Sequence, residues 1–373
     1  MQATNRRNHD RNRIVPWAIA VALAAGTVLV PVSSSAQWLN YPTPGIPRTP
    51  DGKPDLSAPV PRTADGKPDL TGLWRPNAGG YQINITADLA PTDVRPWALA
   101  LTKQRAQRLY AESPTTLCLP FGPGVGAMAP FLWVKMIPTS RSIVMLYENR
   151  TSDREAFMDG RPLPLDPNPT WNGYSVGHWD GDTLVVESAG FNDKTWLDLV
   201  GHPHSEALRV TERFTRVDFG HVQLHMTIDD PQAYTRSFTV PVDLQLMPDT
   251  ELLERVCNEN ERDVARTAGI KVSPITIPPS VLSTFVGTYD LDTGAAGGVL
   301  RVDIGRSFFV TLNGDELMLQ RPGDKVRSVL TPVSETHFVH GSGADVEFIS
   351  DAQGTHLVFQ IAEGEARATR RNR

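Results

Sequence analysis

The residues from Gly173 to Asp230 constrain the fold more than any other stretch, because they contain two hairpins in succession. Tyr174 to Trp179 and Thr183 to Ser188 are rich in β-forming residues and are separated by Asp180-Gly181, a pair that supplies the positive φ angles of a type I′ turn. The second hairpin turns at Asp218-Phe219-Gly220. The stretch therefore predicts four consecutive antiparallel strands.

Hydrophobic alternation sets the register of the second hairpin. Apolar residues share one face of its two strands: Leu208, Val210, Phe214, Val222, Leu224, Met226 and Ile228. This register places Glu212 opposite Met226 on the apolar face and turns Arg213 and His225 to the other face. Because a carboxylate among apolar groups is costly unless it is paired, two interpretations stay open for Glu212. It is either neutralised by a structural arginine or serves as an acid/base or ligand-orienting group in a barrel mouth.

The connection between the hairpins, residues 190–207, is long for a compact β domain and is therefore a candidate functional loop. It contains His202-Pro203-His204, in which the proline favours extended backbone at the preceding residue. Residues two apart in extended chain face the same side, so both imidazoles can meet one ligand. Three interpretations remain for the pair. They are a metal site completed by Asp198, His221 or Glu212, proton transfer by His204 with Asp198 or Glu212 as orienting group, and histidines that hydrogen-bond the backbone without chemistry.

The N-terminus has the pattern of an export signal. A basic segment with Arg6, Arg7, Arg11 and Arg13 precedes an apolar run over 14–32, and Ser34-Ser35-Ala36 resembles a cleavage site. We expect residues 1–36 to be a signal peptide and the protein to be periplasmic or secreted, with retention as a membrane anchor as the alternative. No other segment is apolar enough to span a bilayer. Cleavage removes four basic residues and one acidic residue, which moves the formal charge from −6 to about −9, so a nucleic-acid partner is not predicted.

The remaining chain divides into four segments. Residues 37–71 are rich in proline and repeat the pattern Pro-Arg-Thr-x-Asp-Gly-Lys-Pro-Asp-Leu at 47–56 and 61–70, which indicates extended chain with turns, a strap or spacer. A main β domain is expected over 72–268, a linker over 269–280 and a smaller β module over 281–373. Cys118 and Cys257 are predicted to form a disulfide bond in an oxidising compartment, with two buried thiols as the alternative.

Several elements of the main domain can be placed. Leu73-Trp74 predicts the first buried strand, and Thr92 predicts the cap of a helix over about 93–112. The glycine-rich residues 118–126 read as a loop, because they do not connect a strand to a helix. A strand is expected over 251–257. In the last module the predicted strands are 285–291, 299–304, 307–312, 316–321, 326–332, 337–340, 346–350 and 356–361, followed by a solvated tail with Arg367, Arg370, Arg371 and Arg373.

Two resemblances accompany these patterns. The motifs CLP at 118–120, GYSVGHWDGDTLVVESAGFNDKTWLD, GHPHS, TERF and CNEN resemble a family of exported bacterial proteins that has no assigned activity, over about residues 70–265. That likeness implies kinship and export but no chemistry. FVGTYDL, LTPVSETHFV and VEFISDAQGTHLVF resemble the lipocalin-like accessory module at the C-terminus of some exported hydrolases.

These patterns predict an all-β protein, with a calycin-like antiparallel barrel or sandwich and one packed helix, followed by the lipocalin-like module. We expect a small-molecule-binding protein whose apolar pocket is lined by Trp171, Trp179, Phe191, Trp196 and His202. The alternative is a cofactor-free lyase, isomerase or hydrolase that uses His204 with Asp198 or Glu212, and a purely structural envelope protein is a third possibility. No Gly-x-Ser-x-Gly or Ser-x-x-Lys motif identifies a nucleophile. No cofactor is predicted, and a divalent metal on His202 and His204 stays possible.

Overall fold

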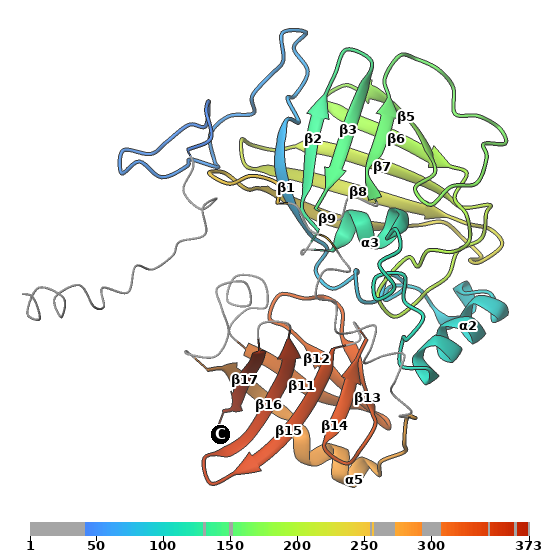
Figure 1. Cartoon of the computed structure of the whole chain (residues 1–373), viewed down its shortest axis with the longest axis vertical. Coiled ribbons are helices and arrows are strands. Elements are labelled where there is room, and N and C mark those ends of the chain that lie inside the picture. Colours follow the sequence, from blue (N-terminus) through green and yellow to red (C-terminus); the bar gives the residue numbers. More distant parts are fainter. Residues whose placement is uncertain are drawn as a thin grey trace, which may run out of the picture. The chain divides into compact units, whose positions relative to one another are not determined.

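The computed structural model describes residues 42–371 apart from 130–131, 149–151, 254–255, 257–272, 293–306, 342–343 and 362–363. The predicted signal peptide and Cys257 lie outside these residues, so cleavage and the disulfide bond stay predictions. Two closed β-barrels, of nine and eight strands, account for most of the described chain (Figure 1). The all-β prediction is confirmed.

The first barrel has nine strands. They are β1 (Gly72–Asn77), β2 (Val134–Pro138), β3 (Ser142–Tyr147), β4 (Arg154–Phe157), β5 (Tyr174–Asp180), β6 (Thr183–Ala189), β7 (Arg209–Arg216), β8 (His221–Asp229) and β9 (Phe238–Leu246). Closure comes from β9 pairing with β1. An odd number of strands cannot close with antiparallel neighbours alone, and the single parallel pair is β4 with β5. The proline-rich residues 158–173 make the return connection that a parallel pair requires.

The four central strands have the predicted register. In the β7–β8 hairpin Glu212 pairs with Met226 and Arg213 pairs with His225, and β5 to β8 are antiparallel neighbours in chain order. Alternate residues of β8 and β9 are buried, so one face of each strand packs into the barrel. The interior is a core of aliphatic, methionine and aromatic side chains that includes Trp74, Met136, Met145 and Met226.

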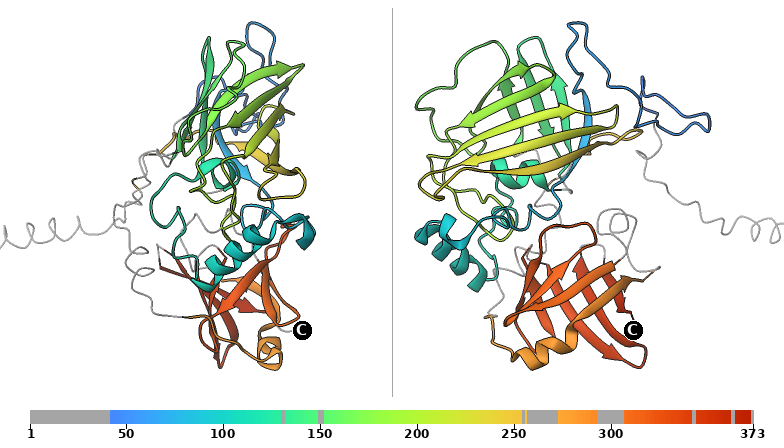
Figure 2. Two further views of the ribbon diagram at one scale, coloured as in Figure 1. Left: turned by 90° about the vertical axis from the view of Figure 1, so that its right-hand side faces the viewer. Right: turned by 180° about the vertical axis from the view of Figure 1, so that it is seen from behind.

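The two repeats fold in the same way and fasten residues 42–71 to the first barrel. Each makes a turn closed by a threonine amide that donates to a lysine carbonyl, from Thr49 in the first copy and Thr63 in the second, both at 2.9 Å. The arginine of each copy then binds an aspartate of the barrel: Arg48 binds Asp249 and Arg62 binds Asp182. The segment projects beyond the strands in the right-hand view of Figure 2. Both copies of the repeat thus attach residues 42–71, which we call the strap, to the first barrel.

The helices differ from the sequence prediction. Residues 93–112 contain only α2 (Pro96–Gln107), preceded by the 3-10 turn η1 (Pro91–Asp93), and the residue that caps α2 is Arg95, with Pro96 in the first turn. The predicted cap at Thr92 was wrong, because the proline sets the helix start. Positive φ angles at Leu109 and Tyr110 turn the chain away soon after the helix ends.

A second correction concerns the glycine-rich segment, which contains the short helix α3 (Gly122–Met128) and is not wholly a loop. All seven residues of α3 are buried. A Cβ on Gly122 would collide with Thr195, and a Cβ on Gly124 would collide with the backbone of Leu197. The glycines therefore let the helix approach the 190–207 loop closely, and this packing replaces the helix propensity that the sequence lacks.

The second barrel begins after α5 (Pro279–Leu282) and η3 (Ser283–Phe285). Its strands are β10 (Gly287–Leu291), β11 (Ser307–Asn313), β12 (Glu316–Gln320), β13 (Ser328–Pro332), β14 (His337–His340), β15 (Asp345–Asp351), β16 (Gly354–Ile361) and β17 (Gly364–Arg370). Seven of them match predicted strands, whereas the predicted strand 299–304 lies outside the described residues. The predicted strand at 251–257 is not formed over 251–253.

The predicted arginine tail was wrong. Arg367 and Arg370 belong to β17, which pairs with both β16 and β10 and closes the second barrel. Arg367 bonds Asp351 and Arg371 bonds Asp290, whereas Arg373 lies outside the described residues. The small residues Ala366 and Ala368 alternate with Arg367 and face the core. The inner face of the strand is therefore apolar but carries little hydrophobic signal in the sequence.

The two barrels contact each other directly. Lys325 donates its backbone N–H to the carbonyl of Gly79 at 3.0 Å, and Val326 belongs to the same buried cluster as the first barrel's interior. Tyr110 and Trp196 pack with Val339 of β14. In the described residues no helix is long and apolar enough to cross a membrane.

Candidate functional site

Asp198 anchors the 190–207 loop. Its Oδ2 accepts the backbone N–H of Ile85 at 2.8 Å and lies 2.5 Å from His202 Nδ1, while its Oδ1 accepts the backbone N–H of His202 at 3.0 Å. The Asp198 side chain is fully buried. Three donors around one carboxylate offset the cost of burying its charge, so the loop folds around this residue.

The other nitrogen of His202 reaches a residue that the sequence did not single out. Its Nε2 lies 3.0 Å from the Oγ1 of Thr86, and Thr86 Oγ1 also lies 3.0 Å from Asn84 Oδ1. The side chains of Asp198, His202, Thr86 and Asn84 thus form one chain of hydrogen bonds. No motif marks Thr86 or Asn84 in the sequence, because they lie more than 100 residues from their partners.

His204 and His202 have different hydrogen-bond partners. Its Nε2 lies 2.6 Å from Thr195 Oγ1, and its Nδ1 faces the carbonyl of Ser205 at 3.0 Å. The ring packs edge-on against Phe191. Burial lowers the pKa of His204, and the hydrogen bond to Ser205 acts in the opposite direction. The structure therefore pairs His202, and not His204, with Asp198.

Glu212 follows the loop closely in sequence, but its partner is Arg154 and not a loop histidine. Arg154 of β4 donates to its two oxygens at 3.2 and 2.5 Å inside the first barrel. Burial raises the pKa of Tyr147 to about 12. Arg154 Nε has no partner among the described residues. Of the two interpretations of Glu212, this arrangement corresponds to a carboxylate that a structural arginine neutralises.

The four aromatic residues expected around a pocket each contact different neighbours. Phe191 is buried in the core of the first barrel, and Trp179 packs against that core at its edge, with Lys67 of the strap over its ring. Trp171 lies under Lys194, and Trp196 lies under Arg105 of α2. Each ring therefore has a separate packing role in this structure.

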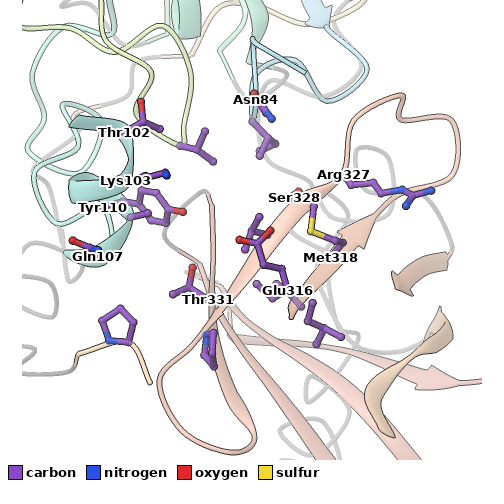
Figure 3. A pocket seen from close by; sticks show the side chains of 18 of the residues that line it. Asn84, Thr102, Lys103, Gln107, Tyr110, Glu316, Met318, Arg327, Ser328 and Thr331 are labelled. Carbon is purple, nitrogen blue, oxygen red and sulfur yellow. The ribbon is translucent and has the colours of Figure 1, made fainter. Parts of the chain in front are cut away.

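A cavity of about 370 Å³ opens elsewhere, between α2, the loops around Asn84 and Val200, and strands β12 and β13 (Figure 3). We call it the inter-barrel cavity. Its wall is largely apolar and includes Ile83, Ala106, Val200, Met318, Val329 and Leu330.

Polar groups stand at two sides of the inter-barrel cavity. Tyr110 and Lys103 face Glu316 and Thr331 across it (Figure 3). Burial raises the pKa of the Tyr110 hydroxyl. Asn84 contributes to the wall and also bonds Thr86, so the cavity adjoins the hydrogen-bonded chain that ends at Asp198.

No three histidine, cysteine, aspartate or glutamate side chains within the described ranges are grouped to hold a metal ion. Comparison with protein-family models gives no match, and comparison with curated proteins also gives none. The fold and the cavity therefore define the class, an all-β protein of two closed barrels with a small-molecule-sized cavity between them.

Proposed function

We propose that this protein binds a small, largely apolar molecule in the inter-barrel cavity. The observation that supports the proposal is the cavity itself, because its volume of about 370 Å³ lies in the range of small-molecule sites. Its exposed wall is mainly apolar in area, although half of its twenty lining residues are polar or charged. The sequence also suggested a small-molecule-binding protein. The site proposed here is, however, not the aromatic pocket that the sequence analysis expected.

The polar groups indicate which end of a ligand would be recognised. Glu316 is an exposed carboxylate that points into the cavity opposite Tyr110. Lys103 stands on the α2 side. A ligand with an apolar body and a hydrogen-bonding end fits this distribution, since the body packs on Met318, Val329 and Leu330 while the polar end meets the rim.

We extend the proposal to the fold relationship, the export and the disulfide bond of the protein. Closed antiparallel barrels are the architecture of calycin-like and lipocalin-like proteins. All strand pairs of the second barrel are antiparallel, as are all but the β4–β5 pair of the first, and the sequence motifs noted above also support this relationship. The basic and apolar N-terminal residues support export to the periplasm or the medium, and Cys118 and Cys257 would form a disulfide bond there. We also infer that the protein belongs to the family of exported bacterial proteins that its motifs resemble.

The test uses N-phenyl-1-naphthylamine, a neutral apolar probe whose fluorescence rises in an apolar site. We expect saturable binding to the full chain. Ala106→Trp fills the cavity from α2 and is expected to weaken binding at least about tenfold, because the probe and the indole compete for the same space. Gln104→Trp is the control, since Gln104 is exposed on the same helix and does not line the cavity. Wild-type affinity in Ala106→Trp with an unchanged melting temperature would rule out this site.

A further inference from the structure

We propose that Thr86, His202 and Asp198 act as nucleophile, base and orienting group in the hydrolysis of an ester held in the inter-barrel cavity. This inference rests on the proposed binding function, because the cavity supplies the substrate. It starts from two distances, 3.0 Å from Thr86 Oγ1 to His202 Nε2 and 2.5 Å from His202 Nδ1 to Asp198 Oδ2. A hydroxyl, an imidazole and a carboxylate in this order form a triad whatever their order in the sequence.

Asp198 fixes the tautomer of His202. A carboxylate only accepts hydrogen bonds, so the proton of the neutral imidazole is on Nδ1 and the lone pair is on Nε2. The backbone N–H groups of Ile85 and His202 hold the carboxylate in place. The nitrogen that faces Thr86 is therefore the basic one, as abstraction of the hydroxyl proton requires.

Asn84 supplies a donor beside the nucleophile. The backbone N–H of Thr86 points at Asn84 Oδ1 at 3.1 Å, and an N–H only donates, so this atom is the amide oxygen. The amide Nδ2 donates no hydrogen bond to the described residues. Because Asn84 also lines the inter-barrel cavity, its Nδ2 is placed to stabilise negative charge on a substrate oxygen close to Thr86.

The Thr86 hydroxyl has one proton and two acceptors at the same distance, His202 Nε2 and Asn84 Oδ1, both at 3.0 Å. When the proton is directed at Nε2, the oxygen is activated for attack. A substrate that engages Asn84 favours this arrangement, since it draws the amide toward the cavity. Substrate binding and activation of the nucleophile are then coupled.

The reaction proceeds in two balanced steps. Thr86 Oγ1 bonds the ester carbonyl carbon while its proton moves to His202 Nε2, and the carbonyl electron pair becomes an oxyanion that Asn84 stabilises. Collapse breaks the bond to the alcohol oxygen, which leaves with the proton from His202 and gives an acyl-threonine. Water then attacks the acyl carbon and gives its proton to His202. Collapse releases the acid and returns the proton to Thr86.

A comparison with His204 shows why His202 is the histidine that we assign as the base. His204 Nε2 also faces a threonine hydroxyl, that of Thr195, at 2.6 Å. Its Nδ1, however, faces a backbone carbonyl and not a carboxylate. Thr195 is fully buried. Thr86 is only partly buried, and although it does not line the cavity itself, it bonds Asn84, which does. The His204 pair therefore lacks both the charge that stabilises an imidazolium and access to a substrate.

The test is hydrolysis of p-nitrophenyl butyrate by the full chain, with probe binding measured in parallel. Thr86→Val keeps the shape of the side chain without its hydroxyl and is expected to lower turnover at least about 100-fold. Thr86→Ser keeps the hydroxyl and is expected to retain turnover. His221→Gln, a substitution of an exposed histidine outside the cavity, is the control. Mass spectrometry is expected to find a butyryl group on Thr86 after rapid quenching.

The outcomes separate the two proposals. Probe binding without wild-type hydrolysis overturns the triad and leaves the binding function standing. If the wild-type chain neither binds the probe nor hydrolyses the ester, both the binding function and the triad are overturned. Equal turnover by Thr86→Val and the wild-type chain assigns the hydrolysis to another group and also overturns the triad. If Thr86→Val does not fold, acylation of Thr86 in the wild-type chain decides the question.

Discussion

Arg154 and Glu212 form a two-bond ion pair inside the first barrel, with donor–acceptor distances of 3.2 and 2.5 Å. The two residues come from β4 and β7, and both are at least nine-tenths buried. Burial acts to lower the pKa of Arg154, but Glu212 and Tyr147 together raise it above its ordinary value, so the guanidinium keeps its charge.

Removing one partner of this pair leaves the other charge buried and unpaired. Glu212→Ala is therefore expected to lower the free energy of unfolding by about 3–5 kcal/mol. Arg213→Ala on the same strand breaks only the exposed pair with Asp180, at a cost below about 1 kcal/mol. In urea denaturation the double substitution Arg154→Met/Glu212→Leu should cost less than the two single changes together, and strict additivity would contradict the coupling.

Two glycines of α3 should respond to alanine in opposite directions. A Cβ on Gly124 has no room against the backbone of Leu197, whereas a Cβ on Gly126 meets nothing within 4 Å. Gly124→Ala should destabilise the protein by about 1–3 kcal/mol. Gly126→Ala should stabilise it by about 0.5–1 kcal/mol through helix propensity. Thermal unfolding measures both, and equal effects would show that the helix does not pack against the loop as described.

The strap repeats have identical leucines with different burial. Leu70 is 1% exposed in the first barrel's core, whereas Leu56 is only partly buried against it. Leu70→Ala is expected to cost about 2–5 kcal/mol, and Leu56→Ala clearly less. Chemical denaturation compares them directly. Equal costs would mean that both copies attach the strap to the same extent.

Stability should fall below neutral pH because of His204. Burial lowers the pKa of this residue from its ordinary value of 6.5, so the unfolded chain takes up a proton at a higher pH than the folded chain does. The contribution of His204 is therefore complete above about pH 6.5 and is lost as the pH falls toward the folded pKa.

Urea midpoints at pH 7.5 and 5.5 measure this dependence. His204→Gln should have a smaller difference between the two midpoints than the wild-type chain, since glutamine does not titrate. His225→Gln, at an exposed position of β8, should keep the full difference. A wild-type difference in His204→Gln would assign the acid sensitivity to other groups.

The sequence alone determined the central strands and their register. Alternation has a period of two, and a slip of one residue would turn every apolar side chain of β8 to solvent. For this reason the opposition of Glu212 and Met226 could be read from the residues. The need for a partner to Glu212 followed as well, but only closure of the barrel brings Arg154 to it.

Tertiary structure decided the remaining features, because they depend on contacts between residues distant in the chain. Helix α3 forms where propensity opposes it, since Gly122 and Gly124 allow close packing on Thr195 and Leu197. Strand β17 has alanines on its inner face and is fixed by its two neighbours. Thr86 and His202 meet although 116 positions separate them. The inter-barrel cavity arises only where the two barrels and α2 pack together, a contact that no local pattern specifies.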